Sequence, residues 1–403
     1  MKHLFFATGN EGKFNETKTF LEDVRPGLQL EQLPIDVPEI QSDDPDEIVR
    51  QKIGYVQRQT SLPFIVDDMS FEADRLSGPM DRAIRYEGLR ELFNEGDSIQ
   101  AVARVALYNF GDSFTFEGSV RGKLNFSLRS EAEVVFALED FITMPDGRSL
   151  SEELADPDFR NHRILALVQL ADYLRNTDNS DSDKKVAIGE RWGTRAAGWQ
   201  DVIKDESSYV NHEDNYERVN TMIRKYAPLV SGAALEIGCG TGEAGRILKS
   251  SNPGLNLLAT DISDGMLDEA RKLADENKLD IEYKKLDITN GMLAEGTFSI
   301  VMSRGVVVSH LPKSDIFDFL EGAARHTAQN GYLIFDFIQD TSVGEIEKPI
   351  DSKNEFTLSQ MDEILTYCGM TRVEDAGSDA MRVRVVCYKK MDSKEGKVDE
   401  SDK

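Results

Sequence analysis

The chain has 403 residues, of which 40% are hydrophobic, and this length favours two domains, each with its own core. Its formal net charge of −26 argues against binding a nucleic-acid polymer, because a phosphate backbone would be repelled. No run of about eighteen apolar residues is present, so no membrane span is expected. The three cysteines show neither a disulfide framework nor metal-ligand spacing, which favours a reducing, cytoplasmic setting.

Two polar segments divide the chain. The stretch from Asn176 to Lys185 has no apolar side chain and is typical of an interdomain linker, and the charged C-terminal stretch is typical of a free tail. Both remaining parts alternate short apolar runs with amphipathic stretches, which is the pattern of α/β folds. The predicted boundaries are domains over 1–176 and 187–390, a linker over 177–186 and a disordered tail over 391–403.

A glycine turn with a lysine lies near the start of the chain. It follows a predicted strand over 4–7 and precedes a predicted helix over 14–23. Backbone N–H groups at a helix N-terminus, together with a lysine side chain, suit the binding of a triphosphate. The candidate phosphate-binding residues of this turn are Thr8, Gly9, Asn10 and Lys13.

Two adjacent carboxylates, Asp67 and Asp68, end the next clear strand pattern, over 63–69. Paired acids at a strand end can anchor Mg²⁺ while one of them activates water, although a solvated turn is the commoner context for such a pair. In the predicted helix before this strand, Glu47 and Lys52 lie about 140° apart around the axis, so they need not meet.

The motifs of the N-terminal half resemble those of the inosine triphosphate pyrophosphatase family, which hydrolyses abnormal purine nucleoside triphosphates to monophosphate and pyrophosphate. The matching segments, within about residues 1–175, are Thr8-Gly-Asn-x-x-Lys13, Pro45-Asp-Glu-Ile-x-x-Gln-Lys52, Val66-Asp-Asp68, Ser77-Gly-Pro79, Phe116-Glu-Gly-Ser119 and Asn161-His162-Arg163. The resemblance implies a mixed α/β domain that forms homodimers. The roles that it implies are phosphate contacts from Lys13 and Lys52, Mg²⁺ ligation by Glu39 and Asp68, base catalysis by Asp68, and substrate contacts from Asp67, His162 and Arg163.

One part of this half departs from the family pattern. The Phe-Gly-aromatic-Asp-Pro base clamp falls on 136–140, where Leu138 replaces the stacking aromatic and Glu139 replaces aspartate. The lysine expected before the His-Arg pair falls near Pro157 and is absent. Stacking on a base is worth about 1–3 kcal/mol. We therefore expect either a changed base preference or a nucleotide-binding domain with weak hydrolysis.

A second glycine turn, Gly238 to Gly242, joins a predicted strand over 233–237 to a predicted helix over 243–250. Glycines at such a turn let the backbone approach a ligand closely. Asp261 ends the next predicted strand about twenty residues later, where a carboxylate can bind the two hydroxyls of a ribose. The turn alone would also suit NAD, but nothing else in the sequence supports a hydride-transfer site.

The strands that follow complete a pattern that resembles the class I S-adenosylmethionine-dependent methyltransferase family. Asp287 ends another predicted strand, where it can accept a hydrogen bond from an adenine amino group with Ile288 against the ring. The resemblance covers about 150 residues and implies a Rossmann-like, seven-stranded sheet with an antiparallel last strand, for which 383–388 is the candidate. The cofactor-binding residues that it implies are Glu236, Gly238, Gly240, Gly242, Asp261, Ile262, Asp287, Ile288 and Ser303.

Aromatic and polar residues precede this predicted sheet in the stretches 191–199 and 208–216. They either close over the cofactor and the methyl acceptor or form a helical cap on the sheet edge. His310 is a candidate general base because its ordinary pKa lies near neutrality, with a purely structural histidine as the alternative. The whole sequence predicts a bifunctional enzyme acting on a nucleoside triphosphate and a small-molecule methyl acceptor. The alternative is a methyltransferase whose N-terminal half only binds nucleotides or dimerises.

Overall fold

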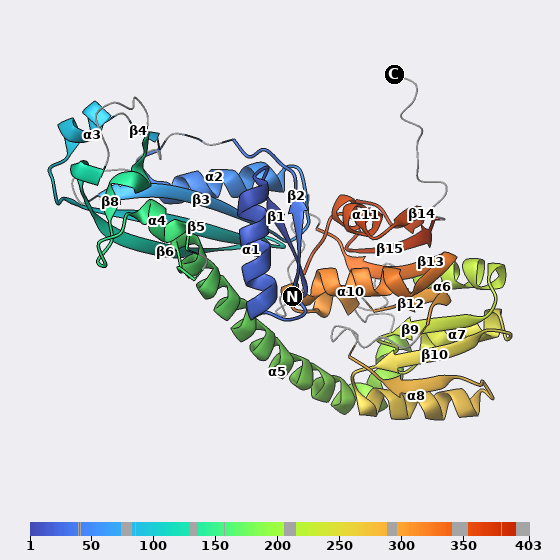
Figure 1. Cartoon of the computed structure of the whole chain (residues 1–403). Coiled ribbons are helices and arrows are strands. Elements are labelled where there is room, and N and C mark those ends of the chain that lie inside the picture. Colours follow the sequence, from blue (N-terminus) through green and yellow to red (C-terminus); the bar gives the residue numbers. More distant parts are fainter. Residues whose placement is uncertain are drawn as a thin grey trace, which may run out of the picture. The chain divides into compact units, whose positions relative to one another are not determined.

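A computed structural model describes residues 1–38, 40, 42–73, 83–84, 86–128, 136–156, 158–204, 215–287, 296–305, 307–340, 354–379 and 381–391. The chain divides into two compact units, Met1–Thr177 and Asp178–Lys403, and each contains its own large sheet (Figure 1). None of the helices formed by these described residues is long and apolar enough to cross a membrane.

The first unit is a mixed α/β domain, as predicted. Its six-stranded sheet has the order β2-β1-β3-β5-β6-β8, in which β1 pairs in parallel with β2 and β3 and the remaining pairs are antiparallel. The strands are β1 (His3–Ala7), β2 (Gln29–Leu33), β3 (Phe64–Ala73), β5 (Ser98–Asn109), β6 (Asp112–Leu124) and β8 (Ile142–Thr143). The smaller elements are β4 (Ala83–Ile84) paired with β7 (Phe136–Ala137), α3 (Tyr86–Leu92), η1 (Phe126–Leu128), η2 (Leu138–Phe141) and α4 (Leu150–Leu154).

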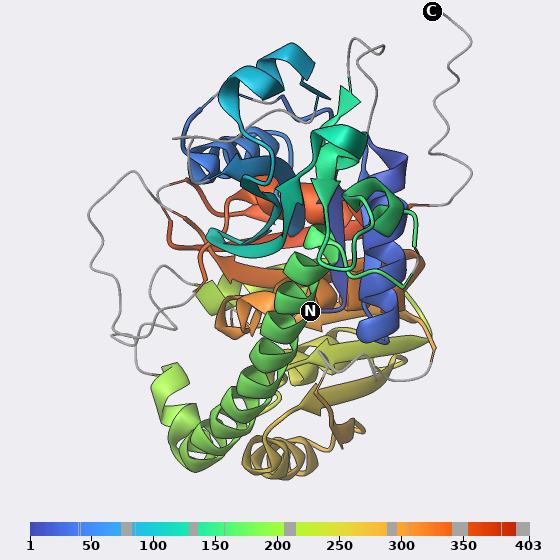
Figure 2. The ribbon, with the colours of Figure 1, turned by 60° about the vertical axis from the view of Figure 1, so that its left-hand side comes forward.

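Helices cover both faces of this sheet. Leu21 of α1 (Glu11–Val24) and Leu167 of α5 (His162–Lys204) pack with Phe6 and Ile65 in one buried cluster, so α1 and the start of α5 share a face. Figures 1 and 2 show these two helices side by side. On the other face, α2 (Pro45–Gln57) packs against β3 and β5. The glycine turn between β1 and α1 thereby lies at the end of a central strand.

The predicted linker over 177–186 is not an irregular segment, because helix α5 runs through it without interruption. No glycine or proline interrupts the helix between residues 162 and 188, and short polar side chains tolerate a helix at a modest cost. Asp181 is also buried within the second unit, where its carboxylate accepts hydrogen bonds from Ser314 (2.6 Å) and Lys184 (2.8 Å). Of the predicted tail over 391–403, only Met391 is among the described residues.

The second unit has the predicted Rossmann-like sheet of seven strands, in the order β11-β10-β9-β12-β13-β15-β14. The predicted antiparallel strand at 383–388 is confirmed as β15, which pairs antiparallel with both neighbours. The strands are β9 (Ala233–Ile237), β10 (Asn256–Asp261), β11 (Glu282–Lys285), β12 (Phe298–Ser303), β13 (Thr327–Ile338), β14 (Met370–Ala376) and β15 (Val383–Lys390). The helices are α6 (Asn215–Tyr226), η4 (Ala227–Leu229), α7 (Glu243–Ser251), α8 (Asp264–Glu276), α9 (Val307–His310), α10 (Lys313–His326) and α11 (Leu358–Tyr367).

The core of this unit lies between the sheet and the helices. Ile223 of α6 and Leu248 of α7 pack on Ala234, Ile300 and Ile334 of the central strands. Helices α10 and α11 pack against each other and against β13 and β14 respectively. Because β9, β10 and β11 are parallel neighbours, their carboxyl ends meet at one edge of the sheet. This edge carries the residues predicted to bind the cofactor.

Candidate functional sites

The turn between β1 and α1 is held open by its own hydrogen bonds. Asn10 caps α1, because its side chain accepts the N–H of Lys13 at 3.0 Å, while the Asn10 N–H donates to Thr8 Oγ1 at 3.1 Å. The turn lines a cavity of about 770 Å³ together with Lys52 and Asp67. A cavity of this size, walled by a helix N-terminus and two lysines, is suited to an anionic ligand.

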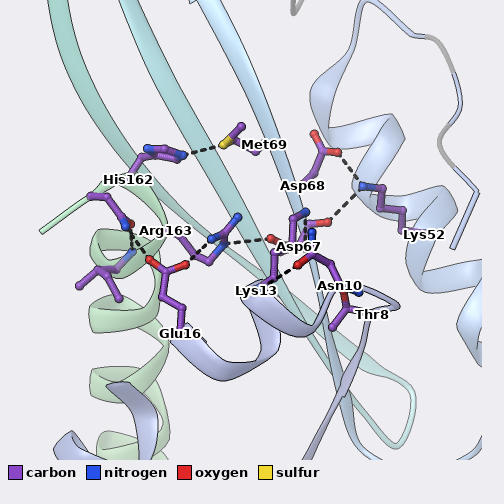
Figure 3. Close-up of polar contacts among 12 residues, drawn as sticks. Thr8, Asn10, Lys13, Glu16, Lys52, Asp67, Asp68, Met69, His162 and Arg163 are labelled. Carbon is purple, nitrogen blue, oxygen red and sulfur yellow. Dashed lines mark hydrogen bonds and ion pairs between the residues drawn. The ribbon is translucent and has the colours of Figure 1, made fainter. Parts of the chain in front are cut away.

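The two adjacent acids do not end their strand as predicted, because β3 continues to Ala73. Neighbouring side chains of a strand point to opposite faces, so the carboxylates separate. The Asp67 carboxylate meets α1 and α5, whereas that of Asp68 meets Lys52 of α2 (Figure 3). The carboxylates therefore form two sites, one on each side of the strand.

Asp67 is the centre of a buried ion-pair network. Its Oδ1 accepts from Lys13 Nζ at 3.1 Å and its Oδ2 from Arg163 Nε at 3.0 Å (Figure 3). Burial raises the pKa of Asp67, but the charges of Lys13 and Arg163 outweigh this effect and hold the pKa below its ordinary value. Asp67 is thus a carboxylate that neutralises the cations around the cavity.

Asp68 and Lys52 form a second buried pair. Lys52 Nζ lies 2.7 Å from Asp68 Oδ1 and 3.1 Å from the carbonyl oxygen of Asp67, and both side chains are more than nine-tenths buried. Glu47 is exposed on the same helix and accepts a hydrogen bond from Ser42 instead. The helix therefore brings Lys52, and not Glu47, to the acid strand.

The predicted base-contacting pair is turned away from the cavity. Arg163 is bound by the carboxylates of Asp67 and Glu16, and Glu16 also accepts from Asn161 at 2.6 Å. His162 is buried, with Nε2 at 2.7 Å from the sulfur of Met69. Neither His162 nor Arg163 lines the cavity of the glycine turn.

Leu138 also differs from expectation. It is fully buried and packs with Phe71 and Phe141 in a hydrophobic cluster of the first unit, so it does not stand in the cavity where a stacking ring would. Glu139 is likewise buried. The Pro157 position and the Ser77-Gly-Pro79 turn lie outside the described residues.

The predicted magnesium ligands are only partly described. Asp68 is placed as given above, whereas Glu39 lies outside the described residues. No group of three or more His, Cys, Asp or Glu side chains in the described part of the chain is arranged to hold a metal ion. Mg²⁺ is usually held by one or two carboxylates plus the phosphates of a substrate. Asp68 is buried and bound to Lys52, which lines the cavity of the glycine turn, but Asp68 itself does not line it, so magnesium binding there stays a prediction.

Two residues of this unit were missed by the sequence analysis. Glu16 fixes Arg163, as described above. Arg104 is buried in β5 across from Asp68 and forms ion pairs with Glu72 at 2.8 Å and Glu117 at 2.9 Å. An arginine inside an otherwise apolar strand was the available signal, because a buried guanidinium needs carboxylate partners.

In the second unit, the glycine turn after β9 adopts backbone conformations that other residues rarely reach. Gly238 and Gly240 have φ values of 64° and 53°, and a Cβ on Gly238 would lie 2.8 Å from Val307. Gly242, also left-handed, caps α7. A cavity opens beside this turn, and the predicted residues that line it are Glu236, Gly238, Gly240, Asp261, Ile262, Asp287 and His310.

The remaining predicted cofactor residues do not line this cavity. Ser303 is buried at the end of β12, and Gly242 serves the helix cap. Ile288 lies outside the described residues. Asp261 Oδ2 accepts the Gly240 N–H at 2.8 Å and its Oδ1 accepts the Ser263 N–H at 2.9 Å. This carboxylate therefore shapes the glycine turn as well as facing the cavity.

The first aromatic segment before the sheet is part of helix α5 and lines the cavity, and its closing over a cofactor and methyl acceptor stays a prediction. Trp192 and Trp199 are part of α5 and both line the cavity. Gly193 lies close to Gly265 at the start of α8, where a side chain would not fit. Residues 208–214 of the second predicted aromatic segment are outside the described part, but Tyr216 lines the cavity.

Lys185 and Arg304 also line this cavity and were not predicted. Lys185 Nζ lies 2.5 Å from Asp315 and 3.9 Å from Asp287, so it links the cap helix to the predicted adenine ligand. Arg304 is buried, pairs with Glu243 at 2.8 Å and lies over the ring of Tyr216 at 4.1 Å. These contacts join segments distant in sequence, so no local motif indicates them.

Glu236 lies at the bottom of the cavity and is almost completely buried. Burial raises its pKa to about 8, so near neutral pH the folded protein holds this proton. The unfolded chain releases it above about pH 4.5, so the contribution of Glu236 to the unfolding free energy falls as the pH rises from 4.5 to about 8.

We therefore expect the second unit of wild type to lose several kcal/mol more stability between pH 5.5 and 8 than that of Glu236→Gln. The measurement is urea unfolding followed by tryptophan fluorescence, because both tryptophans of the chain lie in this unit. Glu276→Gln, exposed at the end of α8, is the control and should follow wild type. If the unfolding free energies of wild type and Glu236→Gln change equally with pH, Glu236 is not held in its neutral form in the folded protein.

Comparison with known proteins relates the first unit to a family of nucleotide hydrolases. Residues 4–173 match the Ham1 family. A dITP/XTP pyrophosphatase of Methanopyrus kandleri is 30% identical over 187 residues, which are 43% of this chain and 96% of that protein. The corresponding protein of Thermococcus kodakarensis is 28% identical over 183 residues, 43% of this chain and 97% of that protein.

Residues 234–331 match the methyltransferase domain family. A ribosomal RNA small subunit methyltransferase C of Haemophilus influenzae is 34% identical over 74 residues, 18% of this chain and 22% of that protein. Among solved structures, magnesium protoporphyrin IX methyltransferase of Synechocystis is 16% identical, with a TM-score of 0.42, over 51% of this chain and 96% of that one. The family match over residues 234–331 identifies a methyltransferase domain in the second unit.

Proposed function

We propose that the chain is a bifunctional enzyme. It belongs to the Ham1 family through its residues 4–173, and it also contains a methyltransferase domain at residues 234–331. The first activity is Mg²⁺-dependent hydrolysis of a nucleoside triphosphate to monophosphate and pyrophosphate. The second is methyl transfer from S-adenosylmethionine to a small molecule.

One observation supports the hydrolase above all. The N-terminus of α1, Lys13 and Lys52 line the cavity of the β1–α1 turn, and Lys52 pairs with the buried Asp68, which does not itself line the cavity. A triphosphate in this cavity would meet Lys13, which Asp67 holds while no substrate is bound. Asp68 can then accept a proton from the attacking water, with the Lys52 ammonium beside its carboxylate. Mg²⁺, when bound, supplies charge neutralisation for the triphosphate, with Asp68 and Glu39 as its proposed ligands.

The deciding experiment is a screen of pyrophosphate release by the full chain with Mg²⁺. The substrates are dITP, XTP, ITP, ATP and GTP, each with and without S-adenosylmethionine. Release from at least one triphosphate is the expected result. If none is hydrolysed, the alternative holds, in which the first unit is a nucleotide-binding or dimerising module. Homodimerisation stays a prediction.

The methyltransferase proposal is supported by the second cavity. The glycine turn, Asp261 and Asp287 line it at the carboxyl ends of three parallel strands, where the backbone can approach a cofactor. S-adenosylmethionine, when bound, supplies the methyl group. Calorimetry of S-adenosylmethionine binding to the full chain tests this assignment. His310 lines the same cavity and is proposed as the base that takes a proton from the acceptor.

We expect only weak discrimination by the first site between ITP and ATP or GTP. A site rejects a wrong base strongly when its buried polar groups would be left unpaired. Here Arg163 is already paired with Glu16 and Asp67, and His162 lies beside Met69. The ratios of kcat/KM should therefore stay below about a thousandfold.

The matched variant is Glu16→Gln, which weakens the hold on Arg163 without changing the shape of residue 16. It should change the ratio of kcat/KM for ITP over ATP if Arg163 can reach a base. Asp23→Asn, an exposed residue of the same helix outside the cavity, is the control and should leave the ratio unchanged. A preference of a thousandfold or more in wild type would show that other residues read the base.

A further inference from the structure

The cavity of the second unit has a wall that the cofactor proposal does not use. One wall consists of strand-end residues such as Asp261 and Asp287, which we assign to S-adenosylmethionine. The other wall consists of Trp192 and Trp199 from the cap helix and the segment from His310 to Pro312. The methyl acceptor has to lie beside the cofactor, so the second wall is the available place for it.

The rings of this second wall form a corner. Trp192 lies 5.2 Å from Trp199 and 6.1 Å from His310 between ring centroids, at interplanar angles of 83° and 88°. Both tryptophans are partly exposed. Rings arranged in this way let a flat molecule lie against one face while its edge meets the other ring, an arrangement that aromatic pairs favour.

Two arginines lie beside the Trp192 ring, outside the cavity lining, and favour an anionic group over a cationic one on a molecule that packs against this ring. The guanidinium groups of Arg191 and Arg195 lie over the Trp192 ring at 6.0 and 5.6 Å from its centroid. A cationic amine would have to displace them from the ring face or suffer repulsion. The described residues provide no carboxylate partner for Arg195, which is exposed.

The cap helix is also basic in a strongly acidic protein. Between residues 184 and 204 it has five lysine or arginine residues and two acidic ones, whereas the whole chain carries a net charge of −26. This helix segment is therefore more favourable for an approaching anion than the acidic chain is on average.

We propose that the methyl acceptor is a planar aromatic molecule with an anionic group, whose ring packs in the Trp192–Trp199–His310 corner and whose anion is bound by Arg195. The anion is a phosphate, as in a nucleotide, or a carboxylate on an aromatic ring. The proposal rests on the assignment of S-adenosylmethionine to the strand-end residues of the same cavity. It makes Trp192 and Arg195 determinants of specificity.

Tryptophan fluorescence of the full-length protein is a selective readout for this test. Trp192 and Trp199 are the only two tryptophans of the chain, and both line this cavity, so nucleotide binding to the first unit does not contact the reporter. The protein is first saturated with S-adenosylhomocysteine. Titrations then use matched pairs of probes: guanosine 5′-monophosphate against guanosine, and 4-hydroxybenzoate against its neutral methyl ester. Phenethylamine is the cationic probe.

We expect the anion of at least one pair to bind more tightly than its neutral partner, and phenethylamine to bind more weakly than that anion. Arg195→Gln should lower affinity for the anion by about ten- to a hundredfold and leave affinity for the neutral partner unchanged. Arg175→Gln changes an exposed arginine of the same helix within the first unit and should behave as wild type. The pair that responds identifies the anion as phosphate or carboxylate.

Three outcomes would overturn the proposal: equal affinity for the anion and its neutral partner in both pairs, tightest binding of phenethylamine, or no fluorescence change with any probe. Unchanged affinity for S-adenosylhomocysteine in Arg195→Gln shows that the variant is folded. If S-adenosylhomocysteine itself does not bind to wild type, the methyltransferase proposal fails first. The two failures are thereby distinguished.

Discussion

Replacing Asp68 by asparagine should lower the rate of pyrophosphate release by about 10²–10⁴-fold, because a positioned general base contributes that much to proton transfer. The change keeps the shape of the side chain, and Lys52 keeps its contact with the Asp67 carbonyl oxygen. Triphosphate binding should largely remain, since Lys13 and the glycine turn are untouched. The measurement is kcat for the best triphosphate of the screen, with the dissociation constant determined separately by calorimetry.

Asp46→Asn is the matched control for this variant. Asp46 is exposed on α2, the helix that carries Lys52, and its carboxylate lies 3.8 Å from Arg104. The substitution therefore removes a charge near Asp68 but outside the cavity. Its kcat should stay within about twofold of wild type. If Asp68→Asn keeps more than a tenth of the wild-type kcat, Asp68 is not the base, and the role passes to another acid of the site.

The elements of the second unit were predictable because its signals are local. Strand, glycine turn, helix and terminal carboxylate follow one another within about thirty residues, as in the dinucleotide-binding pattern. The structure places β9 at the predicted 233–237 and β15 over the predicted 383–388. What the sequence could not show is the second wall of the cavity, because Trp192 and His310 are more than a hundred residues apart and meet only in the folded chain.

In the first unit, the predicted residues are present but their partners were not foreseeable. The motif Val-Asp-Asp indicates two carboxylates, and only a continuing strand directs them to opposite faces. Asp67 is bound by Arg163, which lies 96 residues further along the chain. A motif that compares positions one at a time does not reveal that Arg163 binds the carboxylates of Asp67 and Glu16.

The helix over 177–186 was not predicted, for a different reason. Composition alone favours a solvated segment between the two units, and most of this segment is exposed. The carboxylate of Asp181 is nevertheless buried through hydrogen bonds with Ser314 and Lys184. A polar side chain can be buried when its hydrogen bonds are satisfied, and hydropathy patterns do not record such bonds.

Asp261→Ala should weaken S-adenosylmethionine binding by about 10²–10⁴-fold. The carboxylate is expected to accept two hydrogen bonds from the ribose, each worth about 1.5–3 kcal/mol when the acceptor is charged. It also accepts the N–H groups of Gly240 and Ser263, so its loss relaxes the glycine turn. Burial raises the pKa of Asp261 despite these hydrogen bonds. As the pH falls, Asp261 is therefore protonated earlier than an ordinary aspartate, and S-adenosylmethionine binding should weaken at a correspondingly higher pH.

Calorimetry with S-adenosylmethionine is repeated with Asp261→Asn and Asp264→Asn. These variants separate the contribution of the Asp261 charge from that of its oxygen acceptors. Asp261→Asn keeps one oxygen acceptor without the charge and should fall between wild type and Asp261→Ala. Asp264 is exposed three residues later and pairs with Lys285, so Asp264→Asn should bind as wild type does. Affinity within about threefold of wild type in Asp261→Ala, with the circular dichroism spectrum retained, would remove Asp261 from the cofactor site. In that case the carboxylate serves only the turn, through the bonds to Gly240 and Ser263 that hold it in the folded protein.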